Sequence, residues 1–350
     1  MLLSSSSVKL TKFLAGGSAG SLLSKISRKN NFISKYLHLT TTTMSGEATR
    51  KLREFGYAFN KEGKLRKVDS STGEPGNEPF QFDVYPDYGQ NQRHYEELAN
   101  CIPEIIYELL EQNGMVRVYT PENVPKEQAT FIFTSREKLD KPKKLLVLIH
   151  GSGYVRAGQW ARSLIINNSL DHGTVLPYIK KARELGYDIL VTNTNDNYRE
   201  SEDGTMKVIP GHNNPINHAV TVWEKYVAGS SPESVAIVAH SYGGSVTLAL
   251  AKQFEQFFKH KVFAVALTDS AHFSGGHSVV KNLRPITRNF VSSDKPLGTV
   301  IKTPSDDLPQ VSAGHTKHEW TSYSAMSAVF EFIEQRYEEF LASSKSKTEL

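Results

Sequence analysis

The stretch VAHSYGGS, residues 238–245, places Ser241 on a candidate sharp turn directly after an apolar run. A serine hydroxyl is a weak nucleophile until a base removes its proton, and a substrate must also be able to reach it. A strained turn between a strand and a helix presents the serine, provided that the residues two before and two after it are small. Ala239 and Gly243 meet this condition, and Gly244 gives further room. We therefore predict a nucleophile elbow at Ser241; the alternative is a structural turn with an unactivated serine.

Segments typical of strands and of helices alternate on both sides of this turn. Strand-like runs are expected at 115–120, 130–135, 143–151, 187–193, 234–240 and 261–269. Helical spacing of apolar residues is found at 94–114, 175–186, 216–228, 245–258 and 326–341. Repeated strand–helix–strand units imply right-handed crossovers and a mainly parallel sheet with helices on both faces. The expected fold class is α/β, in one α/β-hydrolase-like domain.

A second expected component of the site is the glycine-bearing stretch LIHGSGYVRAG, residues 148–158. In this fold the loop after the third strand provides one backbone N–H for the oxyanion that forms during acyl transfer. We assign that donor to Gly151 or Ser152, and the second donor to the amide of Tyr242, which follows the serine. The alternative is a glycine-rich turn that binds no anion.

The catalytic base is expected in a loop just before the last helix, in LPQVSAGHTKHEWTS, residues 308–322. This stretch offers His315 and His318. We favour His318, because its spacing to the final helix leaves a loop long enough to fold back over the elbow.

The acid that orients this histidine has two candidates. Asp294 follows the strand that we count as the seventh, which is the usual location, and Asp269 follows the sixth. Either carboxylate could fix the imidazole tautomer and stabilise the imidazolium. We lean slightly towards Asp294.

No cofactor or metal is indicated by the remaining motifs. The histidines outside the candidate site form no zinc-type spacing, and we expect surface or capping roles for them; they are His212, His218, His272 and His277. Phosphate-binding glycine loops of the GxGxxG and GxxxxGK[ST] types are absent, so no nucleotide cofactor is expected. The one cysteine, Cys101, is expected to be a small buried residue.

The two ends of the chain carry different signals. Residues 1–46 contain six basic residues and no acidic one, so we expect a disordered or targeting leader, either a mitochondrial transit peptide or an inert extension before Met44. The folded domain is expected at 47–342 and a flexible tail at 343–350. The tail ends in KTEL, which is similar to a KDEL retrieval signal of the endoplasmic reticulum. No apolar run approaches the roughly 20 residues of a membrane span.

Four strings together resemble one known family over about residues 50–340. They are IHGSGYVRAGQWARSLIIN, AHSYGG, VALTDSAH and VSAGHTKHEWTS. The resemblance is to the Argonaute-binding-protein-two family, in its animal branch of cotranscriptional regulators. It implies a hydrolase-like fold with Ser241 at the proposed nucleophile, partners among Argonaute, chromatin or splicing proteins, and a location in nucleus and cytoplasm. It implies no established substrate.

Two functions follow from these observations. A third possibility is that the protein is a degenerate remnant of a hydrolase. The first, which we favour, is an adaptor for protein partners that retains a hydrolase-like site. The alternative is an active serine hydrolase that cleaves an ester, thioester or amide. Direct nucleic-acid binding is not expected, since the chain outside the leader is nearly neutral and lacks a basic stripe with interleaved aromatic residues. The polar segment 195–215 is expected to be a surface loop, and it is short at the place where the animal members carry a long charged insertion.

Overall fold

A nine-stranded mixed sheet organises the protein. The computed structural model describes residues 46–272 and 277–348; residues 1–45 of the expected leader and the last two residues of the KTEL tail lie outside these ranges. The strands run in the order β13 (Val300–Ile301), β14 (Gln310–Ser312), β12 (Thr287–Val291), β11 (Val262–Thr268), β10 (Val235–His240), β6 (Leu145–Ile149), β7 (Asp188–Val191), β5 (Thr130–Thr134), β4 (Val116–Thr120). The six central strands from β14 to β7 pair in parallel. The strands predicted from the sequence are confirmed, and so is the α/β-hydrolase-like class.

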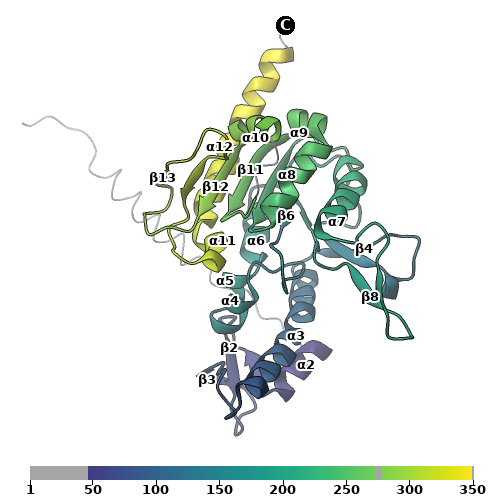
Figure 1. The fold of residues 1–350 in the computed structure, drawn as a ribbon, viewed down its shortest axis with the longest axis vertical. Helices are drawn as coiled ribbons and strands as arrows, with labels where there is room; N and C mark the ends of the chain where they lie inside the picture. Colours follow the sequence, from purple (N-terminus) through teal and green to yellow (C-terminus); the bar gives the residue numbers. More distant parts are fainter. Residues whose placement is uncertain (1–45, 273–276, 349–350) are drawn as a thin grey trace, which may run out of the picture. The chain divides into compact units, whose positions relative to one another are not determined.

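Helices cover both faces of this sheet (Figure 1). One face carries α3 (Tyr88–Gln112), α6 (Leu176–Glu184) and α12 (Met326–Thr348), whose apolar residues share a core with Leu146, Leu148 and Val238. The other carries α7 (Pro215–Val222), α8 (Gly243–Gln253), α9 (Glu255–Lys261) and α10 (His277–Leu283). Neighbouring residues of one strand enter opposite cores, since side chains alternate across a sheet. This explains why the central strands are apolar throughout.

Smaller elements complete the described chain. A three-stranded sheet and a helix precede α3; they are α2 (Glu47–Glu54), β1 (Tyr57–Phe59), β2 (Leu65–Val68) and β3 (Pro75–Pro79). Short helices α4 (Arg162–Asn167), α5 (Leu170–Gly173) and α11 (Thr321–Ser324) lie near the one-turn helix η4 (His318–Trp320). A π-helical segment, η2 (Trp223–Ala228), continues α7. None of the helices in the described ranges is both long and apolar enough to cross a membrane.

The structure departs from the predicted elements in three places. The helix expected at 245–258 is interrupted at Phe254, and α8 and α9 both pack aromatic or aliphatic residues into the same core. The polar segment expected to be a surface loop contains the hairpin of β8 (Tyr198–Glu200) and β9 (Met206–Val208). The last helix continues to Thr348, six residues beyond the boundary expected for the folded domain.

Candidate active site

Ser241 lies on the sharp turn between β10 and α8, where the sequence analysis expects it. Its φ is +54°, a left-handed conformation that is uncommon for a residue other than glycine. The turn is tied to the neighbouring strand, because the Ser241 N–H donates to the carbonyl of Thr268 at 3.0 Å. Strained backbone of this kind persists only where the surrounding structure enforces it. The turn therefore has the geometry of a nucleophile elbow.

Close packing explains why small residues surround the serine. A Cβ atom at Gly243 would lie 2.8 Å from the carbonyl oxygen of Ile149. At Gly244 it would lie 1.7 Å from Ser270 Oγ. Neither position can accept a side chain without moving its neighbours, and Ala239 is fully buried. The small residues of the motif are thus required by contacts in this fold.

His318 pairs with Asp269. The His318 Nδ1–H donates to Asp269 Oδ2 at 2.8 Å, and the backbone N–H of Ser292 donates to Asp269 Oδ1 at 3.0 Å. Asp269 follows β11 directly and, like Ser241, has a positive φ, +46°. A proton held on Nδ1 leaves Nε2 as the free basic nitrogen, which is the tautomer that a serine nucleophile needs.

The pair favours its charged form. The hydrogen bond to Asp269 is the main reason why the pKa of His318 is raised above its ordinary value, against the opposing effect of burial. Burial acts to raise the pKa of Asp269, but the hydrogen bonds from His318 and Ser292 outweigh it and lower that pKa. The carboxylate can therefore stabilise an imidazolium at His318.

The two other candidates for base and acid lie apart from this pair. Asp294 is exposed on the loop after β12, and its carboxylate makes no hydrogen bond or ion pair with another described residue. His315 stacks on Trp320, with ring centroids 4.9 Å apart, and its Nδ1 accepts the backbone N–H of Lys317. Of the two aspartates, the one that the sequence analysis ranked second is therefore the one that meets His318.

Two of the three expected oxyanion donors, Gly151 and Tyr242, lie beside the serine. A Cβ atom at Gly151 would be 3.0 Å from Ser241 Cβ and 3.5 Å from its Oγ, so the loop after β6 passes directly over the turn. Within the described ranges, the amides of Gly151, Ser152 and Tyr242 donate to no backbone or side-chain acceptor. Gly151 is buried and Tyr242 is half-buried, and such N–H groups without acceptors are rare in proteins. The amide of Gly151 beside Ser241, with that of Tyr242 next to it in the chain, suits a site for a negatively charged oxygen.

Asn195 holds the loop that carries two of these donors. Its Nδ2 donates to the carbonyls of Gly151 at 2.9 Å, Val155 at 3.0 Å and Gly153 at 3.2 Å. The buried His150 adds a hydrogen bond from Nδ1 to the Gly151 carbonyl at 2.8 Å. Burial lowers the pKa of His150 to about 4, so this ring is neutral near pH 7. The sequence analysis did not identify either residue, because a single Asn or His in a loop carries no recognisable spacing.

His240 packs against the His318–Asp269 pair. Its ring lies 4.7 Å from that of His318, and its Nδ1–H donates to the Thr268 carbonyl at 2.9 Å. Burial lowers the pKa of His240 to about 4. A neutral ring here supports His318 without placing a second positive charge against it.

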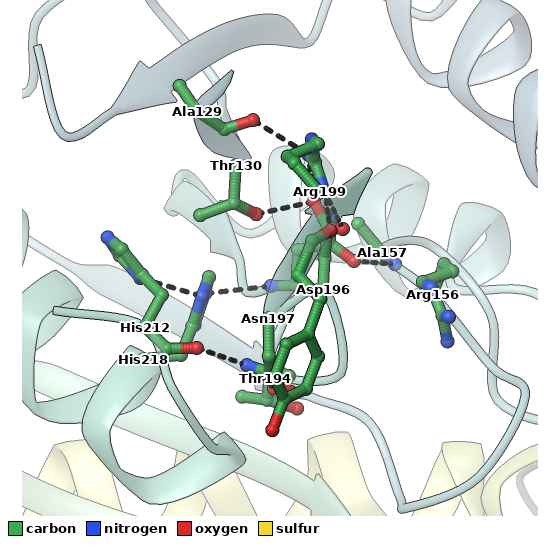
Figure 2. Close-up of polar contacts among 12 residues, drawn as sticks. Ala129, Thr130, Arg156, Ala157, Thr194, Asp196, Asn197, Arg199, His212 and His218 are labelled. Carbon is green, nitrogen blue, oxygen red and sulfur yellow. Dashed lines mark hydrogen bonds and ion pairs between the residues drawn. The ribbon is translucent and has the colours of Figure 1, made fainter. Parts of the chain in front are cut away.

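The expectation of surface or capping roles is wrong for His212 and His218, which are both fully buried. Figure 2 shows the two rings in contact, with their Nδ1 atoms 3.0 Å apart. His218 Nε2 accepts the Asn193 N–H at 3.2 Å, so its Nδ1 carries the proton that His212 accepts. Burial lowers both pKa values, and both rings are neutral.

This buried network reaches the loop after β6. Asn193 Oδ1 accepts the Ala157 N–H at 2.9 Å, and Asn197 Nδ2 donates to the His212 carbonyl at 2.6 Å. Figure 2 also shows Asp196 bound by Arg199 and by the Thr130 hydroxyl. Asp196 therefore ties the loop after β7 to the start of β5, whereas Asn193 ties it to the loop after β6. No group of three or more ligands suited to a metal ion occurs among the residues that the structure describes.

His272 is also not at the surface. Only 5% of its side chain is exposed, and it lies between Ser270 and Asp307. The side chain of His277 falls outside the described residues. Cys101 is buried in α3, as expected.

The strand order and the turn at Ser241 define this chain as an α/β-hydrolase-like protein. Residues 48–297 match the model of the Arb2 domain, and the chain belongs to this family. It is 38% identical to cotranscriptional regulator ARB2A of Mus musculus, over 84% of this chain and 82% of the relative. A cotranscriptional regulator ARB2A homolog of Dictyostelium discoideum is 31% identical, over 81% of this chain and 79% of the relative.

Solved structures with a related arrangement have distant sequences. A histone deacetylase from Saccharomyces cerevisiae matches with a TM-score of 0.45 and 10% identity, over 69% of this chain and 98% of that chain. A predicted CIB-like hydrolase from Thermoplasma acidophilum matches with a TM-score of 0.36 and 14% identity, over 64% of this chain and its own whole length. The fold class itself rests on the strand order.

Proposed function

We propose that this protein is a cotranscriptional regulator that acts in the nucleus through protein partners, on a scaffold that keeps a serine-hydrolase site. The observation that carries this proposal is the 38% identity to mouse cotranscriptional regulator ARB2A over 84% of the chain. The resemblance described above suggests Argonaute, chromatin or splicing proteins as partners. The near-neutral charge of the chain outside its first 46 residues supports contact with nucleic acid through such partners.

Proximity labelling from the full chain in living cells tests this role. We expect nuclear proteins of the three classes to be enriched over a matched nuclear control, and equally so with Ser241→Ala. Enrichment confined to proteins outside the nucleus would contradict the proposal. Loss of the partners with Ser241→Ala, in a variant that remains folded, would mean that the adaptor role depends on the serine.

The site geometry favours a second function, hydrolysis of an ester, thioester or amide. The observation that carries it is the His318–Asp269 hydrogen bond of 2.8 Å next to a strained serine turn. In this proposal Ser241 is the nucleophile, His318 the base and Asp269 the acid. Apo active sites tighten their hydrogen bonds when substrate binds, so the serine and the histidine need not be bonded beforehand.

The reaction would follow two acyl-transfer steps. His318 Nε2 takes the Ser241 hydroxyl proton while Oγ attacks the carbonyl carbon, and the amides of Tyr242 and of Gly151 or Ser152 bind the oxyanion. His318 then gives the proton to the departing alcohol, thiol or amine, which leaves an acyl-serine. Water, deprotonated by His318, attacks this ester and releases the acid and the free serine.

A fluorophosphonate probe tests the hydrolase function directly. We expect wild-type protein to be labelled at Ser241, and labelling to be lost in Ser241→Ala and His318→Ala. Asp269→Asn should reduce the labelling rate far more than Asp294→Asn, because only Asp269 contacts His318. Absence of labelling in folded wild-type protein would contradict this function and leave the regulator role in place.

A further inference from the structure

A second set of hydrogen-bonded serine, histidine and aspartate side chains lies beside the turn at Ser241. The Ser270 hydroxyl is 2.8 Å from His272 Nδ1, and His272 Nε2 is 2.9 Å from Asp307 Oδ1. The His272 Nε2–H donates to the Asp307 carboxylate, and Nδ1 accepts the hydrogen bond from the Ser270 hydroxyl. A buried histidine with both nitrogens bonded is a fixed link between two loops.

The first of these loops holds the elbow. The N–H of Ala271 donates to the Ser241 carbonyl at 3.0 Å, and Ser245 Oγ donates to the Ala271 carbonyl at 2.7 Å. Ser270 Oγ lies directly against Gly244, at the start of α8. The segment 269–272 is therefore bonded to the residue that presents the nucleophile.

The same segment begins with the acid. Asp269 and Ser241 both have positive φ values, and such strain persists only where several contacts enforce it. Ser270 is the next residue after Asp269, and its N–H donates to Asn289 Oδ1 at 3.2 Å. A shift of Ser270 would therefore move the acid together with the elbow.

The second loop supplies a rigid anchor. Asp307 Oδ1 also accepts the N–H of Leu308 at 2.7 Å, and its Oδ2 accepts from Gln310 Nε2 at 3.1 Å. Gln310 opens β14, so the carboxylate is fixed to the second strand of the main sheet. Through Asp307 and His272, the sheet therefore restrains the segment 269–272.

Ser270 is itself a poor candidate for a nucleophile. Its Oγ is pressed against Gly244, and the His272 side chain that would serve as its base is almost fully buried. The arrangement suits support of the neighbouring site better than chemistry of its own.

We propose that His272 and Asp307 are positioning residues, which hold Ser241 and Asp269 in their working geometry through Ser270. This inference rests on the proposed hydrolase function. It assigns a role to a histidine, a serine and an aspartate that the reaction itself does not use.

The test compares Asp307→Ala with Asp306→Ala, its neighbour. Asp306 is exposed and has no bonded partner in the described ranges, so the two variants remove the same charge from adjacent positions. We expect the fluorophosphonate labelling rate to fall about 10- to 100-fold in Asp307→Ala, in line with small displacements of catalytic groups. Asp306→Ala should stay within about twofold of wild type.

A double-mutant cycle tests whether the residues act as one unit. His272→Leu should lower the labelling rate as Asp307→Ala does, and the double variant should fall no further. Asp307→Asn keeps the side-chain volume and provides the comparison if Asp307→Ala does not fold. Additive losses would overturn the proposal, and so would an adduct found on Ser270 by mass spectrometry, because it would then be a nucleophile.

A readout that needs no labelling separates this proposal from the hydrolase function. The pKa of His318, followed by NMR of its ring, depends on Asp269, with Glu319 and His240 as the other titratable neighbours. We expect this pKa to fall in Asp307→Ala and to stay at the wild-type value in Asp306→Ala. An unlabelled wild type would contradict the hydrolase function alone. An unchanged His318 pKa in folded Asp307→Ala would contradict the positioning role.

Discussion

Ser241 and Asp269 both adopt left-handed backbone conformations although neither is glycine. Such a conformation costs on the order of 1–3 kcal/mol at each residue. The sequence indicated the first of them, because Ala239, Gly243 and Gly244 provide the space that a sharp turn requires. Nothing in TDSAH signals the second, since its strain is enforced by hydrogen bonds from distant Ser292 and His318. That difference explains why the sequence located the sharp turn at Ser241 more readily than the carboxylate that bonds to His318.

The His318–Asp269 pair predicts a definite pH dependence. Labelling of Ser241 requires neutral His318, so its rate should rise with pH through a midpoint above 6.5, the ordinary histidine value. In Asp269→Asn the main cause of the raised pKa is lost, and the midpoint should move down. A pH series of labelling rates measures both midpoints. An unchanged midpoint in Asp269→Asn would contradict the role of this pair.

The same pair affects the stability of the fold, and its two residues lose their contributions at opposite ends of the pH range. The pKa of His318 is raised, so its contribution is complete below about pH 6.5 and is lost as pH rises through the raised value. The pKa of Asp269 is lowered, so its contribution is complete above its ordinary value of 3.8 and is lost as pH falls through the lowered value. Both contributions are therefore complete between about pH 3.8 and pH 6.5, where the pair stabilises the fold most.

At the scale of elements, the central strands were predictable and the polar connections were not. Apolar runs such as 234–240 enter cores on both faces of the sheet, so their composition identifies them. The segment 195–215 is polar and indicated a surface loop, yet it folds into a hairpin and buries His212. Its burial depends on pairing with His218 and Asn197, which spacing along the chain does not specify. The sequence located the loops around Ser241, but it did not identify the residues that hold them, such as Asn195 and His150.

The junction of β10 and α8 gives a packing prediction. Gly244→Ala should lower the free energy of unfolding by about 1–3 kcal/mol, because the new methyl group would overlap Ser270. Denaturant unfolding measures the loss.

Ser270→Gly in the same chain removes the overlapping side chain. It should recover part of the stability lost in Gly244→Ala, as expected for residues in direct contact. Simple addition of the two losses would show that the cost at position 244 arises elsewhere.

Over the whole molecule, the sheet separates two apolar cores, and the second is centred on Trp223. The indole is 1% exposed, and its ring stacks on Phe258 with centroids 5.1 Å apart. Its N–H has no partner among the described residues. The size of the ring, and not its polar atom, is therefore what contributes to this core.

Two substitutions at this position separate size from polarity. Trp223→Ala should lower the free energy of unfolding by about 3–5 kcal/mol, since it leaves a large cavity. Trp223→Phe should cost much less, because no hydrogen bond is broken. Equal losses in chemical denaturation would mean that the indole N–H has a partner after all.

The pairing of His318 with Asp269 has an evolutionary consequence for the loop after β12. Asp294 is exposed and without a bonded partner in the described part of the chain. We therefore expect this position to vary among descendants of a common ancestor, whereas Asp269 and His318 should be inherited or lost together.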